Sequence, residues 1–113
     1  MAFILSKATD ATVTIRALER HPHSSQSFVP LDGTRYLVAV SPTTPHGEPD
    51  HERLVAFIAE GTQAVNCQPG VWHAPHTVLG GSGKFIMLRW DNGTEADVEF
   101  RQIPSGITVD LDE

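Results

Sequence analysis

Four of the chain's six histidines fall in two short segments that could carry chemistry. His21 and His23 stand two residues apart, and side chains at that spacing on a β-strand project from the same face. Both imidazoles could then bind one ion, with the amide oxygen of Gln26 as a further ligand. His73 and His76 offer two more imidazoles far along the chain. Imidazole suits Zn, Ni, Fe and Cu, and an amide oxygen suits Mn, so a metal site is expected if the segments meet.

A simpler interpretation of these histidines stays open. His21 and His23 would be exposed turn residues beside a proline, and His73 would be a hydrogen-bonded core residue. His46 and His51 lie in or next to a loop rich in Pro and Gly, and solvation at the surface explains both. The metal hypothesis therefore depends on whether the two segments converge.

The elements that must position these residues are predicted to be mostly strands. Gly and Pro recur at short intervals, which is typical of an all-β sandwich or barrel. The turn signals include Pro69-Gly70 and Asn92-Gly93, the second a strong hairpin signal. Strands are expected over residues 12–18, 27–30, 36–40, 63–66, 76–79, 84–90, 96–102 and 107–111.

One helix is predicted, over residues 50–60. Leu54, Val55, Phe57 and Ile58 would share a face of that helix, and Gly61 would end it. The whole chain, residues 1–113, is expected to form one mainly β domain, since 113 residues seldom divide into two cores.

Composition narrows the classes of function. The chain has 8 basic and 14 acidic residues, a net charge of −6, which argues against nucleic acid as a partner. No apolar run approaches the roughly 20 residues of a membrane span. Cys67 is the single cysteine, so no internal disulfide can form, and we expect a small buried residue there. These features indicate a cytoplasmic domain, and because small barrels leave edge strands that need cover, a homodimer is expected.

Two segments resemble the ureidoglycolate lyase family, also called ureidoglycolate hydrolase. Residues 21–31 are similar to that family's His-Pro-x-x-Ser-Gln-x-Phe-x-Pro-Leu stretch. Residues 60–75 are similar to its Gly-x-Gln-Gly-Val-Asn-Tyr-x-x-Gly-Val-Trp-His-His-Pro stretch. Order and spacing agree, and the likeness runs from residue 18 to residue 100.

The resemblance implies a cupin-type double-stranded β-helix, a jelly-roll barrel, with one short helix. It also implies a metal site. The cupin motifs place His21, His23, Gln26 and His73 as its ligands, with the barrel bringing the two motifs together. The ion would be a divalent first-row metal, namely Ni, Zn, Mn or Fe.

The resemblance further implies an enzyme that splits (S)-ureidoglycolate, a small anionic substrate, into glyoxylate and urea during allantoin and purine breakdown. His73 and Gln26 would be catalytic, with His73 the central acid, base or ligand. Asn66 and Trp72 would shape the pocket, and Arg20 would meet the substrate carboxylate. Two alternatives remain: a cupin enzyme of other specificity, and a non-catalytic cupin that binds a small ligand and lacks the family's N-terminal segment.

Overall fold

The structure is a computed structural model that describes residues 2–4, 6–7, 12–79, 83–89 and 97–111. These residues form short and long strands joined by tight turns, with a single turn of 3-10 helix, η1 (His51–Arg53). The described part of the chain holds no helix long and apolar enough to cross a membrane. The strands are β1 (Ala2–Ile4), β2 (Ser6–Lys7), β3 (Thr12–Arg20), β4 (Gln26–Pro30), β5 (Gly33–Ser41), β6 (Val55–Gly61), β7 (Val65–Cys67), β8 (Trp72–His73), β9 (Thr77–Val78), β10 (Lys84–Arg89) and β11 (Glu99–Asp110).

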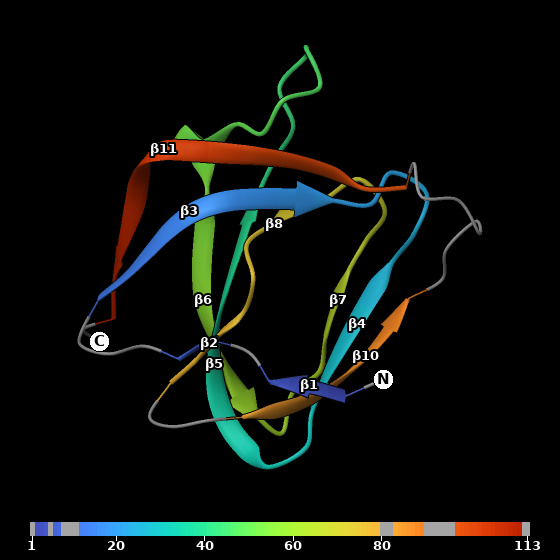
Figure 1. Ribbon diagram of the computed structural model, residues 1–113, viewed down its shortest axis with the longest axis vertical. Coiled ribbons are helices and arrows are strands. Elements are labelled where there is room, and N and C mark those ends of the chain that lie inside the picture. Colours follow the sequence, from blue (N-terminus) through green and yellow to red (C-terminus); the bar gives the residue numbers. More distant parts are fainter. Residues whose placement is uncertain (1, 5, 8–11, 80–82, 90–96, 112–113) are drawn as a thin grey trace.

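The strands form two sheets that face each other as a β-sandwich of the cupin-like jelly-roll type (Figure 1). The smaller sheet has the order β1-β10-β4-β7. The larger sheet has the order β11-β3-β8-β5-β9-β2, with β6 on the other edge of β5. All strand pairs are antiparallel except β2 with β9. The mainly β jelly roll predicted from the sequence is therefore confirmed.

The helix predicted over residues 50–60 is wrong beyond its first turn. Only η1 is helical, and the apolar residues that follow form β6. β6 pairs with β5, with Phe57 opposite Val38. Branched and aromatic residues such as Val55 and Phe57 favour an extended backbone, and the edge of β5 supplies the hydrogen-bond partners that a strand requires. This pairing overrides the helical spacing of the apolar positions.

Most predicted strands are present within one or two residues of their expected bounds, but the last two are one strand. β11 is continuous and pairs with β3, with a shift of register between Gln102 and Ile107. Pro104 cannot donate to the ladder, and Gly106 has a φ of 70°, so the expected break becomes a bulge. The turn predicted at Asn92-Gly93 lies outside the described residues.

The core lies on both faces of β5, which explains its continuous apolar sequence. Tyr36 and Val38 point toward the smaller sheet, and Ala39 points to the opposite face. One cluster, between the sheets, contains Phe28, Tyr36, Val38, Ala59, Cys67, Val78 and Phe85. The outer cluster, on the opposite face, contains Ile15, Leu18, Ala39, Trp72, Ala74 and Ile103.

Candidate functional site

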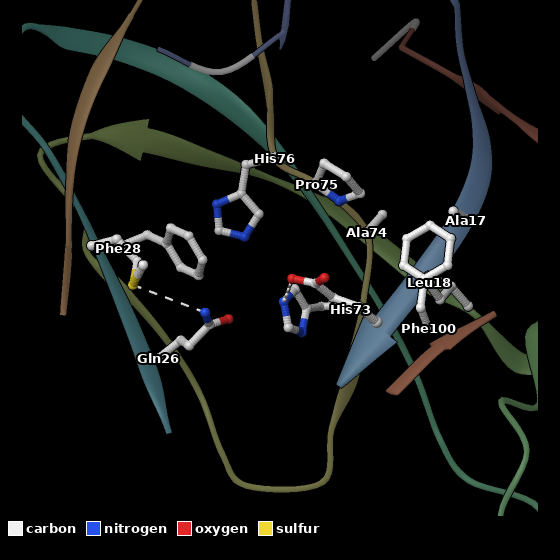
Figure 2. Close-up of a pocket in the computed structure, with 11 residues that line it drawn as sticks. Ala17, Leu18, Gln26, Phe28, His73, Ala74, Pro75, His76 and Phe100 are labelled. Carbon is white, nitrogen blue, oxygen red and sulfur yellow. Dashed lines mark hydrogen bonds and ion pairs between the residues drawn. The ribbon is translucent and has the colours of Figure 1, made fainter. Parts of the chain in front are cut away.

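A pocket of about 210 Å³ lies between the two sheets. On the larger sheet, Glu19 is directly opposite Phe100 on one side and His73 on the other, so the three side chains form a row. The facing wall comes from the smaller sheet and includes Gln26 and Phe28. Figure 2 shows the rings of His73 and His76 and the amide of Gln26 directed into the same space. Drug-sized ligands occupy pockets of about 300–1,000 Å³, so this one suits a smaller molecule.

Glu19, His21 and His73 form a cluster whose ligand atoms all lie within 4.8 Å of one another. The Nε2 atoms of His21 and His73 lie 3.6 Å and 3.7 Å from the same carboxylate oxygen of Glu19. Both imidazoles are buried, and their ring centroids are 5.8 Å apart. Glu19 and His73 come from neighbouring strands, and His21 directly follows β3, so two segments distant in sequence converge.

Backbone carbonyls orient both imidazoles. His21 Nδ1 lies 2.9 Å from the carbonyl oxygen of Asp97, and His73 Nδ1 lies 3.3 Å from that of Val71. A carbonyl oxygen only accepts hydrogen bonds, so each Nδ1 carries the proton and donates. Each Nε2 is therefore the nitrogen directed toward the cluster, and in the neutral ring it carries a lone pair, which is the arrangement found in metal-bound histidines. The same lone pair can accept a proton from a substrate.

The Glu19 carboxylate stays ionised in this setting. Its contact with His73, in which the protonated ring donates from Nε2 to the carboxylate, is the main cause that holds the pKa of Glu19 below the ordinary 4.5, while partial burial opposes the shift. The nearby His21 also favours the charged form. One carboxylate and two imidazole nitrogens thus face one point, where they can bind a divalent cation or exchange a proton.

The structure does not bring His23 into this cluster. His21, Pro22 and His23 form a turn rather than a strand, so the rule that places side chains two apart on one face does not hold. The His23 side chain is exposed, and its backbone N–H donates to the Asp97 carboxylate at 2.7 Å. In the structure, Glu19, which sequence reasoning missed, lies beside His21 and His73 where His23 was expected.

Gln26, predicted as a metal ligand and catalytic residue, lines the pocket but lies outside the cluster. Its side chain is buried, and its Nε2 lies 3.9 Å from the sulfur of Met87. The Gln26 Oε1 atom has no hydrogen-bond partner among the described residues. Gln26 is thus placed to contact a ligand in the pocket.

The three residues predicted to contact substrate do not line the pocket. Trp72 is adjacent to His73 on β8, so it projects to the opposite face and enters the outer cluster. Arg20 is adjacent to Glu19 and likewise lies on the face of Trp72. Its guanidinium lies 4.7 Å from the centre of the Trp72 ring and forms an ion pair with Glu99 at 3.1 Å. Asn66 is exposed, and its amide donates to Ser27 at 2.7 Å.

His76, one of the four imidazoles that the sequence singled out, lines the pocket but lies outside the Glu19–His21–His73 cluster. Its ring is 1% exposed and lies 4.2 Å from the Phe28 ring and 5.5 Å from the Tyr36 ring, measured between centroids. Burial lowers the pKa of His76 to about 4, with a smaller effect of His73, so the ring is neutral at physiological pH. His46 and His51 are exposed, as expected.

Asp97 is the second residue that sequence reasoning missed. Its carboxylate is fully buried and accepts hydrogen bonds from the Ser24 hydroxyl and the His23 N–H, while its carbonyl orients His21. Burial alone would raise the pKa of Asp97, but these hydrogen bonds and the nearby imidazoles hold it below the ordinary 3.8. Its sequence neighbours gave no signal of this role.

We expect Asp97→Asn to lower the free energy of unfolding at neutral pH. Because the folded-state pKa is lowered, the stabilisation is fully present above pH 3.8 and is lost as the pH falls through the lowered value. Urea unfolding at a series of pH values should show that the free energies of unfolding of wild type and variant become more similar as the pH falls. Glu52→Gln, at an exposed position, serves as the control. A difference that stayed constant down to pH 2 would contradict this assignment.

Comparisons with known proteins point to one family. A family profile described as ureidoglycolate lyase matches residues 1–110. A ureidoglycolate lyase of Schizosaccharomyces pombe is 38% identical over 104 residues, which cover 88% of this chain and 54% of the relative. A putative ureidoglycolate lyase of Agrobacterium fabrum is 33% identical, over 98% of this chain and 68% of the relative. A ureidoglycolate lyase of Azotobacter vinelandii is 39% identical, over 88% of this chain and 60% of the relative.

A jelly-roll sandwich with an imidazole–carboxylate cluster between its sheets defines a small cupin-like protein. Within that class, the chain belongs to the ureidoglycolate lyase family. It spans from about half to about two thirds of the length of these curated relatives.

Proposed function

We propose that this chain catalyses the breakdown of (S)-ureidoglycolate to glyoxylate and urea, a carbon–nitrogen lyase reaction of allantoin and purine breakdown. The observation that carries the proposal is the pocket itself. It holds an oriented imidazole nitrogen, His73 Nε2, beside an ionised carboxylate, in a family member whose relatives bear the name ureidoglycolate lyase. The volume of about 210 Å³ suits a substrate of this size.

The reaction needs one proton removed and one delivered. The substrate hydroxyl loses its proton, the oxygen forms the carbonyl of glyoxylate, and the carbon–nitrogen bond breaks. The departing nitrogen then takes up a proton to give urea, so no water or oxidant is consumed. His73 Nε2 is placed to take the hydroxyl proton, and Glu19 beside it stabilises the imidazolium that forms. Return of that proton to the leaving nitrogen completes the cycle.

The charge of the pocket supports a metal ion as part of this site. The substrate is an anion, yet the described residues that line the pocket include Glu19 and no Lys or Arg. A cation held by Glu19, His21 and His73 would supply the missing positive charge, with the unpartnered Nε2 of His21 as one ligand. A His73 Nε2 atom that binds the ion has no lone pair left for the hydroxyl proton, so in the metal-bound form His73 would be a ligand and the ion would promote loss of that proton. When bound, a divalent ion acidifies a hydroxyl and polarises oxygen ligands. Ni, Zn, Mn and Fe all suit this donor set.

The function is tested by measuring the release of both urea and glyoxylate by the purified chain. Ureidoglycolate breaks down spontaneously, so the rate without enzyme is subtracted. Release of the two products in equal amounts above that background is expected. A rate equal to the background would refute the proposal and favour a cupin that only binds a small ligand.

Metal content is predicted to depend on Glu19. Protein purified without a metal-affinity tag should contain a first-row divalent ion by elemental analysis. Glu19→Gln should reduce that content at least tenfold, because the loss of a residue that only supports a metal ligand already lowers metal affinity by about 10–100-fold. His46→Ala, at an exposed histidine, should leave the content unchanged. Equal metal content in wild type and Glu19→Gln would remove Glu19 from the ligand set.

We further propose a cytoplasmic homodimer. Val55 and Phe57 project from the same face of β6 and are 57% and 43% exposed, an apolar pair on a strand that pairs only with β5 among the described strands. Light scattering should give twice the 12.3 kDa chain mass, and Phe57→Glu should shift the mass toward one chain. Leu88→Glu, an exposed position on β10, is the control. A monomer mass at all concentrations would contradict the dimer. Cell fractionation tests the compartment, and the protein is expected in the cytoplasmic fraction.

A further inference from the structure

Three polar atoms in the pocket have no partner among the described residues. They are Oε1 of Gln26 and both ring nitrogens, Nδ1 and Nε2, of His76. All three are buried, and the two residues line the same pocket, Gln26 from β4 of the smaller sheet and His76 from the segment that leads into β9 of the larger sheet (Figure 2). Buried polar groups in folded proteins almost always have hydrogen-bond partners, so a group of three without one points to a ligand.

Aromatic neighbours hold the His76 ring in place. Phe28 lies on one side, with centroids 4.2 Å apart, and Tyr36 is stacked at 5.5 Å and 28°. The ring therefore has little freedom to turn away and seek water, and it is neutral at physiological pH because burial lowers its pKa to about 4. A neutral imidazole offers one N–H donor and one nitrogen acceptor at fixed positions.

Gln26 adds a second neutral donor and acceptor. Among the described residues, the one hydrogen-bonding contact of its amide is the weak one from Nε2 to the Met87 sulfur, at 3.9 Å. A primary amide offers one oxygen and one NH₂ group in either orientation. The wall around Gln26 and His76 is otherwise apolar, with Phe28, Met87 and Pro75. This side of the pocket thus presents hydrogen-bonding groups without charge.

We propose that His76 and Gln26 form a subsite for a neutral, planar ureido group, separate from the Glu19–His21–His73 cluster that takes the acid end. The inference rests on the proposed function and identifies the residues that select its substrate. A ureido group carries a carbonyl acceptor and NH donors, which complement the three unpartnered atoms. It is also flat enough to lie against the Phe28 ring. An analogue without the terminal NH₂ leaves these atoms unpaired and binds more weakly.

The test compares two unreactive ligands, N-carbamoylglycine and N-acetylglycine, by calorimetry. They are close in size and share the carboxylate, but the second has a methyl group in place of the terminal NH₂. Wild type should bind N-carbamoylglycine about 10- to 100-fold more tightly. His76→Phe should reduce that preference to within about twofold, and His46→Ala, at an exposed site, should retain it. Equal binding of both ligands by wild type, or full preference in His76→Phe, would overturn the subsite.

Stability separates this role from a structural one. Phenylalanine fits an aromatic slot and removes two unpaired nitrogens, so His76→Phe should melt at the same temperature as wild type or higher. A lower melting temperature with an unchanged preference would make His76 a structural residue. Gln26→Leu provides a second variant should His76→Phe fail to fold, and it should lose the preference in the same way.

Turnover distinguishes failure of the subsite from failure of the proposed function. If wild type releases urea but binds both ligands equally, the lyase function stands and the subsite is wrong. If wild type binds neither ligand but turns over ureidoglycolate, His76→Phe should raise KM at least tenfold with a smaller change in kcat, and an unchanged KM would overturn the subsite. If there is neither turnover nor binding, both proposals fail.

Discussion

Replacing His73 with alanine should lower the rate of ureidoglycolate breakdown by about 100- to 10,000-fold, the range for loss of a general acid or base. The variant removes the Nε2 lone pair that faces Glu19 at 3.7 Å, and a larger loss is expected if a bound ion leaves with it. The measurement is initial release of urea and glyoxylate, corrected for the spontaneous reaction.

Two further variants control the His73 experiment. Gln26→Ala should cost less, because an amide contributes hydrogen bonds and transfers no proton. His46→Ala, at an exposed position, should leave the rate unchanged. His73 is buried, so circular dichroism must show that His73→Ala remains folded. A folded His73→Ala protein with the wild-type rate would remove His73 from the mechanism.

Trp72→Ala should lower the free energy of unfolding by about 3–5 kcal/mol, as expected for deletion of a fully buried aromatic ring. Trp72 has no exposed surface, packs in the outer cluster and lies beneath the guanidinium of Arg20. Small domains are stable by only about 5–15 kcal/mol, so this variant is expected to be close to unfolding. Urea denaturation measures the change.

Trp72→Phe distinguishes a structural role for this residue from contact with substrate. The variant keeps most of the packing and should retain the wild-type KM, because Trp72 points away from the pocket. Leu88→Ala, at an exposed position of β10, should change stability little. A stable Trp72→Phe protein with a tenfold higher KM would restore Trp72 as a substrate contact.

The sequence contained enough local information to predict most strands. β5 and β10 are long apolar runs between turn residues, and the structure confirms both. The segment that became β6 shows the limit of such patterns. Its apolar residues are compatible with a helical face, and only the neighbouring β5, which lies elsewhere in the sequence, selects the strand. Pairing over long distances is not visible in a local period.

The candidate site was predicted in part for the same reason. The structure places His73 and Gln26 in the lining of one pocket, and His21 lies beside His73. Glu19 was missed because its importance comes from its position opposite His73 on the next strand. Trp72 and Arg20 each adjoin a site residue on a strand, and alternation sends adjacent side chains to opposite faces. Residues next to a predicted catalytic group on a strand are therefore poor candidates for the same pocket.

Because Cys67 is buried, the rate at which its thiol reacts with alkylating reagents measures how often the structure around it opens. The thiol lies opposite Gln26 on the neighbouring strand, and burial raises its pKa to about 11. At pH 8 only about a thousandth of such thiols is ionised, so alkylating reagents react mainly when the sheet opens. As the chain has one cysteine, every labelled molecule records an opening of the wall that carries Gln26. A ligand that bridges the two sheets should therefore slow alkylation.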